Sequence, residues 1–311
     1  MKEKFKLGIT VALVVCGISS VAQLNSFTTS VAEDMYIDYQ KYLNDAFKVF
    51  DGNKGSNAPS AKQLQDSSAI LVEESAVSVP VKTGNSKIMH SENIFSKRRN
   101  SVFIIGKFER KDASGNINFE LSGTAFAIAE NGICVTNYHL LKDIINKSDS
   151  AAIRDSIYFI ITSSKKVYFI EKILAYSQNN DIAVFKINTM GDKLLPIPFG
   201  KAAQVGALVY CLSHPYGHFY SFSCGIVSRN IVTEGSTAAA GYNNKGRPPI
   251  RMEITADYGI GSSGGPILDK SGNLIGVVSS TTPIVHPEAH HQQMVVKDAI
   301  PVKALKALLE E

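Results

Sequence analysis

Three short segments of the chain carry residue types that together can perform acyl transfer. The first ends in Thr136-Asn-Tyr-His139, the second begins with Asp181-Ile-Ala-Val184, and the third is Gly261-Ser-Ser-Gly-Gly-Pro266. A serine hydroxyl becomes a useful nucleophile when a histidine takes its proton, and a carboxylate can orient that histidine. Glycines around a serine let a substrate backbone approach closely. The segments therefore predict a serine nucleophile, with His139 as its base and Asp181 as the orienting carboxylate.

A framework of short strands must position these residues. His139 follows two apolar segments joined by Glu130-Asn-Gly132, a hairpin-type turn, and Asp181 begins another apolar run. From residue 100 onward, runs rich in Val, Ile, Phe and Tyr alternate with Gly, Asn, Asp and Ser. The predicted strands are 101–109, 118–129, 132–137, 155–163, 166–174, 182–188, 206–213, 220–232, 250–255, 265–268, 273–281 and 292–297. Such strands without long helices between them predict an all-β barrel or sandwich, divided near 190–205.

Residues 23–97 follow a different pattern and are predicted to form an extension separate from the main domain. Apolar residues at helical spacing predict a helix over 34–50, a polar and Gly-rich stretch predicts a linker over 51–68, and 69–82 contains a weak strand signal. The extension could serve as a pro-segment, a tether or a partner surface. Ser96-Lys-Arg-Arg99 is either a processing site or a solvated basic turn.

The two ends of the chain carry recognisable local signals. Met1 to Lys6 is basic, Leu7 to Ile18 is apolar, and Ser20-Val-Ala22 offers small residues for cleavage before Gln23. This order predicts a signal peptide over 1–22, and hence a periplasmic or secreted protein with no stable membrane span after cleavage. An uncleaved anchor and a lipid on Cys16 are the weaker alternatives. At the other end, residues 300–311 predict a helix with Pro301 in its first turn.

Composition narrows the classes of partner. The chain of 311 residues is 44% hydrophobic and 19% charged, which is typical of a globular protein. The net charge of the whole chain is +4. Residues 23–311 contain 29 basic and 27 acidic side chains and so carry a net charge of +2. This balance offers no electrostatic reason to expect a nucleic acid partner. His286, His290 and His291 lie close in sequence but lack evident further ligands, so no metal site and no cofactor are predicted.

Cysteines Cys134, Cys211 and Cys224 remain after the predicted cleavage. In an exported protein they could form a disulfide. Cys211 and Cys224 lie at equal distances from a predicted hairpin tip near Gly217, so a symmetric register would place them opposite each other. The sequence leaves open whether this pair is a disulfide or two buried thiols.

The catalytic segments, taken in order, resemble the trypsin-fold serine proteases, and best the bacterial HtrA (Deg) branch. The order His, Asp, Ser agrees with that fold. Further matching segments are Leu212-Ser-His-Pro-Tyr-Gly217, Ser223-Cys-Gly-Ile-Val-Ser228, Gly276-Val-Val-Ser279 and Ala299-Ile-Pro301. The resemblance covers roughly residues 95–311. It implies a protease domain over 98–311 built from two six-stranded antiparallel β-barrels with a C-terminal helix.

The resemblance also implies roles for individual residues. The nucleophile is Ser263 rather than Ser262, because the motif places the reactive serine directly before Gly264-Gly-Pro266. The backbone N–H groups of Gly261 and Ser263 form the oxyanion hole. Many activated trypsin-like enzymes carry Asp where this chain has Ser262, so activation through a new N-terminus is not expected.

Substrate contacts are implied for Asp257, Ser279 and Thr281. Asp257 lies six residues before Ser263. In digestive enzymes of this fold, an Asp at that offset lies in the specificity pocket and attracts Lys or Arg. The HtrA branch instead prefers small apolar residues, and the sequence leaves the two preferences open.

The resemblance leads to an expectation about the whole protein. HtrA proteins usually carry a PDZ domain after the protease, and here the chain ends about ten residues past Ala299-Ile-Pro301. We therefore expect a stand-alone serine endopeptidase that acts on polypeptides, forms an acyl-enzyme on Ser263 and needs no cofactor. The alternatives are a processing protease with one narrow substrate and a non-catalytic interaction protein on a protease scaffold.

Overall fold

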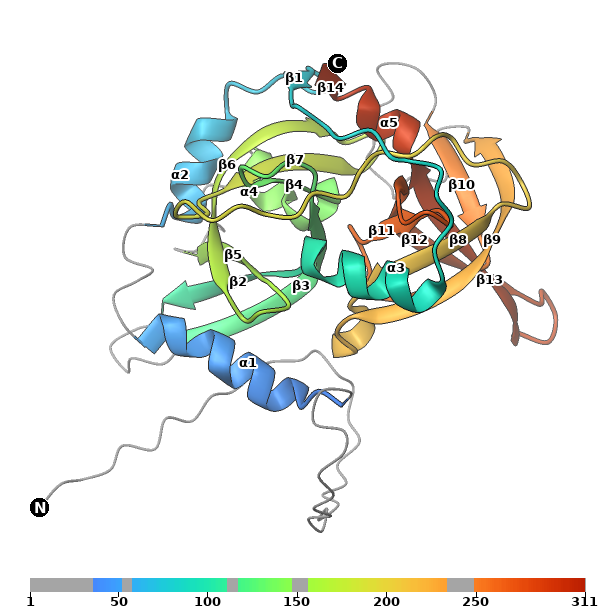
Figure 1. Cartoon of the computed structure of the whole chain (residues 1–311), viewed down its shortest axis with the longest axis horizontal. Helices are drawn as coiled ribbons and strands as arrows, with labels where there is room; N and C mark the ends of the chain where they lie inside the picture. Colours follow the sequence, from blue (N-terminus) through green and yellow to red (C-terminus); the bar gives the residue numbers. More distant parts are fainter. Residues whose placement is uncertain (1–35, 52–57, 111–116, 147–155, 234–248, 311) are drawn as a thin grey trace, which may run out of the picture.

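The computed structural model in Figure 1 describes residues 36–51, 58–110, 117–146, 156–233 and 249–310. The predicted signal peptide, with Cys16, lies outside these residues, as does the start of the predicted extension. Within the described ranges, no helix has both the length and the apolar character needed to cross a bilayer.

Two closed, six-stranded antiparallel barrels form the body of the protein, as predicted (Figure 1). Barrel one consists of β2 (Val102–Arg110), β3 (Ile117–Ala127), β4 (Ile133–Thr136), β5 (Ser156–Ile161), β6 (Val167–Ser177) and β7 (Ile182–Ile187). Barrel two consists of β8 (Leu208–Ser213), β9 (Ser221–Val232), β10 (Ile250–Ile254), β11 (Pro266–Leu268), β12 (Leu274–Val285) and β13 (Gln292–Pro301). Each predicted run overlaps one of these strands, although β12 continues beyond its predicted end at 281.

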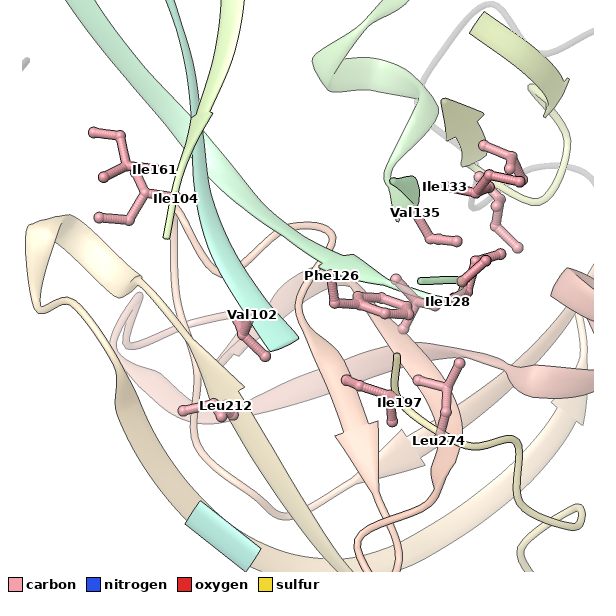
Figure 2. Close-up of a cluster of buried hydrophobic side chains, with 14 of the residues drawn as sticks. Val102, Ile104, Phe126, Ile128, Ile133, Val135, Ile161, Ile197, Leu212 and Leu274 are labelled. Carbon is pink, nitrogen blue, oxygen red and sulfur yellow. The ribbon is translucent and has the colours of Figure 1, made fainter. Parts of the chain in front are cut away.

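A single apolar cluster joins the two barrels. Figure 2 shows Val102 and Phe126 of barrel one near Leu212 and Leu274 of barrel two, with Ile197 of the connecting segment between them. All are buried. Burying each aliphatic side chain contributes about 1.5–3 kcal/mol, and close packing resists sliding. The barrels are therefore fixed relative to each other, which fixes the loops that meet between them.

The elements outside the barrels differ from the prediction. Among the described residues they are α1 (Tyr39–Phe47), the 3₁₀ turn η1 (Lys48–Asp51), α2 (Ala61–Ser68), β1 (Val77–Ser78), α3 (Ser91–Arg98), the 3₁₀ turn η3 (Arg99–Ser101), the 3₁₀ turn η4 (Tyr138–Leu140), α4 (Lys142–Ile145), the 3₁₀ turn η5 (Pro215–Gly217), α5 (Val302–Lys306) and β14 (Leu309–Glu310). The predicted linker over 51–68 is wrong in its second half, because α2 begins there with a capping box between Ser60 and Gln63. The predicted C-terminal helix ends early, since β14 pairs in parallel with β1.

The extension packs against the barrels rather than standing apart from them. Phe47 at the end of α1 stacks on Phe119 of barrel one, with ring centroids 4.0 Å apart, and Phe50 fits among the same aromatic rings. Arg98 of α3 is buried, and its Nε donates a hydrogen bond to the Gly272 carbonyl over 2.7 Å. The basic run at 96–99 is therefore part of a packed helix rather than an exposed turn.

Neither alternative for Cys211 and Cys224, a disulfide or two buried thiols, describes the structure. Both cysteines are free, Cys211 buried and Cys224 exposed. The register of β8 and β9 pairs Cys211 with Ser223 and Tyr210 with Cys224. This shift of one residue from the symmetric pairing points the two sulfurs to opposite faces of the sheet. Burial raises the pKa of the Cys211 thiol to about 12, so it stays protonated at neutral pH.

The packing of Phe47 predicts that the extension stabilises the protease domain. Phe47→Ala should lower the free energy of unfolding by about 3–5 kcal/mol, because it leaves a cavity beside Phe119. Chemical denaturation followed by fluorescence or circular dichroism measures this loss. Lys41→Ala, on the exposed side of the same helix, is the matched control and should change stability by less than about 0.5 kcal/mol. Equal, small effects of both variants would contradict the packing role.

Candidate active site

The structure brings His139 and Asp181 into direct contact. His139 Nδ1 lies 2.9 Å from Asp181 Oδ2 and 3.1 Å from Oδ1. The backbone N–H of His139 also donates to Asp181 Oδ1 over 3.0 Å. The carboxylate therefore fixes both the position and the ring orientation of the histidine. With Nδ1 held in this way, Nε2 is the ring nitrogen left to exchange a proton with a neighbour.

Asp181 occupies a tight turn before β7. Its φ of +58° lies in the left-handed region, which residues other than glycine and asparagine seldom adopt. Two contacts hold it there: Asn137 Nδ2 donates to its carbonyl over 2.9 Å, and Glu73 Oε1 of the extension accepts from the backbone N–H of Gln178 over 2.9 Å. The carboxylate is thus presented by a turn that the barrel and the extension support from opposite ends.

The glycine-rich loop before β11 distinguishes its two serines. Ser262 is fully buried, and its Oγ accepts hydrogen bonds from Ser213 Oγ over 2.9 Å and from the Gly259 N–H over 3.3 Å. Ser263 is half-buried. No hydrogen bond among the described residues involves its Oγ. Ser262 is therefore part of the framework of the turn, and Ser263 is the serine left for chemistry.

Barrel one holds this loop through a buried threonine of β3. The Thr124 N–H donates to the Ser263 carbonyl over 2.9 Å, and Thr124 Oγ1 donates to the Gly261 carbonyl over 2.9 Å. The same hydroxyl accepts from the His214 N–H over 3.2 Å. Thr136 Oγ1 donates to the Thr124 carbonyl over 2.7 Å, which links this contact to the segment that leads to His139.

Close packing places the serine loop beside the histidine. A Cβ added at Gly264 would lie 2.2 Å from the Thr124 carbonyl oxygen and 2.3 Å from Thr136 Oγ1. Gly264 also has a φ of +80°. Only glycine fits this position, because the loop backbone touches the end of β4 just before Asn137 and His139. His139 and Asp181 are thus in contact, and the loop that carries Ser263 packs against the segment that leads to His139.

The geometry around Gly261 favours an anion site. Its φ of +90° and the close approach of the His214 carbonyl, 2.6 Å from an added Cβ, both require glycine. Thr124 holds the Gly261 carbonyl, so the N–H groups of Gly261 and Ser263 are not covered by that oxygen. Neither N–H donates to another described residue. Two free N–H groups beside a serine hydroxyl can stabilise the oxyanion formed during acyl transfer.

His214 helps to hold the loop that carries Ser263, through Thr124, and it does not act as a base. It is fully buried, and its Nδ1 accepts the Tyr220 N–H over 2.9 Å. Burial lowers the pKa of His214 to about 3, so the imidazole is neutral at ordinary pH. The Tyr220 hydroxyl is in turn 3.3 Å from that of Tyr42 in α1. The extension therefore contacts the supports of the serine loop as well as those of Asp181.

Two of the predicted substrate-contact residues, Ser279 and Thr281, lie on β12, and the third, Asp257, lies in the loop between β10 and β11. Ser279 is half-buried and Thr281 is exposed. The strand joins the serine loop directly, because the Val278 N–H donates to the Gly265 carbonyl over 2.8 Å. The Asp257 side chain is 88% exposed and forms an ion pair of 2.8 Å with Lys297. A basic substrate side chain would have to compete with Lys297 for this carboxylate.

The histidine cluster of the sequence analysis, His286, His290 and His291, lies between β12 and β13. His286 and His291 stack at the tip of the exposed β12–β13 hairpin, with ring centroids 5.4 Å apart. His286 Nδ1 accepts the Ala289 N–H over 3.0 Å, which leaves that nitrogen occupied. Over the described ranges, no group of three potential ligands lies in a metal-binding arrangement.

Sequence reasoning missed several residues that position the site. Thr124, Thr136, Asn137, Glu73 and His214 hold the turn of Asp181 or the loop of Ser263 in place. For Thr124 a signal was available, since a hydroxyl in an otherwise apolar strand needs a partner when buried. For Glu73 no signal existed, because its partner lies more than a hundred residues away in the sequence.

Comparison with known proteins agrees with this geometry. Residues 123–277 match the family described as a trypsin-like peptidase domain. Protease Do-like 1, chloroplastic, of Arabidopsis thaliana is 34% identical over 160 residues, which are 50% of this chain and 32% of that protein. Protease Do-like 5, chloroplastic, of the same plant is 29% identical over 203 residues, 61% of this chain and 59% of that protein. A probable periplasmic serine endoprotease, DegP-like, of Brucella suis is 29% identical over 158 residues, 50% and 26% of the two chains.

Solved structures show the same architecture. The crystal structure of Deg5 superimposes with a TM-score of 0.50 at 25% identity and covers 69% of this chain and 90% of that one. The HtrA-type protease AlgW with a decapeptide gives a TM-score of 0.51 at 19% identity, which supports the fold alone. The chain spans less than two thirds of the length of each sequence relative named above.

The contacts of Thr124 predict that its hydroxyl positions the serine loop. Thr124→Val keeps the shape but leaves the His214 N–H and the Gly261 carbonyl without a partner. We expect the rate at which a fluorophosphonate probe labels Ser263 to fall about tenfold to a hundredfold, as a displaced site loses alignment. Thr124→Ser keeps the hydroxyl and should keep most of the rate. Equal rates for the valine and serine variants would contradict the role of the hydroxyl.

Proposed function

Because the chain belongs to the HtrA/Deg family of trypsin-like serine peptidases, we propose that it is an endopeptidase. It cleaves exposed segments of polypeptides outside the cytoplasm, through an acyl-enzyme on Ser263. The carrying observation is the contact of His139 with Asp181 beside a half-exposed serine whose flanking N–H groups have no described protein partner.

Each site residue has a defined role in the proposed mechanism. His139 Nε2 takes the proton of the Ser263 hydroxyl as the oxygen attacks the substrate carbonyl, and it then delivers that proton to the leaving amine. Asp181 keeps the ring in the required tautomer and stabilises the imidazolium. The N–H groups of Gly261 and Ser263 bind the oxyanion. His139 Nε2 then takes a proton from a water molecule that attacks the acyl-enzyme carbonyl, and it returns this proton to the Ser263 oxygen as that oxygen leaves and the carboxylic acid product is released.

The site supports catalysis better than it supports a binding scaffold. A non-catalytic descendant would not need a strained φ at Asp181, and backbone strain of this kind costs about 1–3 kcal/mol. A processing protease with one narrow substrate remains the second candidate, because the exposed β12–β13 hairpin extends the surface beside the site.

Casein digestion tests the proposed chemistry. The purified protein should cleave unfolded casein and bind a fluorophosphonate probe on Ser263, which mass spectrometry of tryptic peptides distinguishes from Ser262. Ser263→Ala should lose both activities, by at least about 10⁴-fold for cleavage. Cleavage that survives in the Ser263→Ala variant would reject this nucleophile. A folded protein that neither cleaves casein nor takes the label would support the scaffold alternative.

Export rests on the sequence of the first 22 residues. When the full chain is expressed in a bacterial host, we expect the product in the fraction released by osmotic shock, with Gln23 as its first residue. N-terminal sequencing of that fraction measures this directly. A product that starts at Met1 and stays in the cytoplasmic fraction would contradict export, while the casein result would stand independently.

A further inference from the structure

A buried ammonium group lies beside the proposed active site and has no role in the mechanism above. The Lys297 side chain is only 14% exposed. Its Nζ donates to the Tyr258 carbonyl over 2.5 Å, lies 5.2 Å from the centre of the Tyr258 ring, and reaches the Asp257 carboxylate over 2.8 Å. A buried lysine is costly unless its charge has a use, so this cation needs an explanation.

The strand pattern places Lys297 inside one end of barrel two. Lys297 and Ala299 alternate along β13 and so share a face of the strand. Ala299 lies in the buried cluster that contains Ile254, Tyr258 and Val278. Across the sheet, Lys297 pairs with Ile254 on one side and Thr281 on the other. The Lys297 side chain thus lies between a buried apolar neighbour, Ile254, and an exposed neighbour, Thr281, and its ammonium takes its polar partners from the loop that begins at Asp257.

This loop and β12 connect Lys297 to the nucleophile. The loop runs from Asp257 to Ser263, and the Val278 N–H ties β12 to Gly265, two residues beyond the serine. From Val278 to Thr281, opposite Lys297, the strand advances about 10 Å. A substrate side chain that points from the reacting carbonyl along this strand therefore runs toward the ammonium.

In the free protein Lys297 pairs with Asp257, and another carboxylate can easily replace this partner. The Asp257 side chain is 88% exposed, and ion pairs of this kind are weak because water competes for the carboxylate. A carboxylate of the substrate could take its place on Nζ while Asp257 turns to solvent. A basic side chain would instead meet a buried cation, with the carboxylate of Asp257 already engaged.

We propose that Lys297 makes this peptidase prefer an acidic side chain, Glu or Asp, at the residue that donates the cleaved carbonyl. The proposal rests on the proposed function and specifies its substrate class. Lys297 would act as the specificity residue, and Asp257, which the sequence analysis considered for that role, would be its counter-ion in the absence of substrate. Charge-assisted hydrogen bonds to a partly desolvated carboxylate are strong enough to set such a preference.

Fluorogenic peptides that differ only at this position test the proposal. We expect the full protein to show kcat/KM for Glu about tenfold to a hundredfold above that for Gln, its neutral isostere, and to reject Lys. Lys297→Met should abolish the preference of Glu over Gln, and Lys297→Arg should keep it. Asp257→Asn should increase it, because it removes the competing carboxylate. Lys270→Met, at an exposed lysine, is the matched control and should leave the ratio unchanged.

The outcomes separate this proposal from the proposed function. Cleavage after Ala or Val with no advantage for Glu would overturn the role of Lys297 while leaving the peptidase intact. A Glu preference that persists in Lys297→Met would overturn it as well. If Lys297→Met fails to fold, the wild-type ratio and the Asp257→Asn variant still decide. Only a protein that cleaves no peptide of the panel and takes no fluorophosphonate label would reject the peptidase activity itself.

Discussion

One buried threonine joins the two halves of the site. Thr124 belongs to barrel one, yet its N–H and hydroxyl serve the Ser263 carbonyl, the Gly261 carbonyl and the His214 N–H, all from barrel two. Its own carbonyl accepts from Thr136, which leads to the histidine. Polar groups buried without partners cost about 1–3 kcal/mol each, so moving either barrel would break several bonds at once. Thr124 thus ties the loop that carries Ser263 to the segment that leads to His139.

The apolar core and the extension reinforce the same junction at longer range. The cluster around Val102, Phe126 and Leu274 prevents the barrels from sliding, and the extension reaches the supports of the site at two further places. Glu73 holds the turn before Asp181, and Tyr42 contacts Tyr220 beneath the serine loop. Through these buried contacts the described part of the extension packs as one unit with the barrels.

The sequence predicted the barrels well because the strand signal is local. Alternating apolar residues and turn residues marked every barrel strand, and the order of His139, Asp181 and Ser263 indicated which ends of those strands must meet. Predictions that depended on register or on distant partners were less successful. The state of Cys211 and Cys224 was left open by the sequence, because it depends on a register that differs by one residue from the symmetric one. Helix α2 was missed because its short polar sequence forms a helix chiefly by packing and capping. Lys297 escaped notice because a lone lysine in a strand carries no signal of burial.

The pairing of β1 with β14 has a consequence for how the chain reaches its native state. Both barrels lie between these two strands in the sequence, and each strand brings a buried side chain to the shared core, Val79 just after β1 and Leu309 in β14. Contacts between distant segments form late, because the chain must close a very long loop before it gains their stabilisation. The segment around β1 therefore cannot complete its packing until β14 has been synthesised. During synthesis, β1 would therefore stay unpaired until β14 is available, and this part of the chain would fold late.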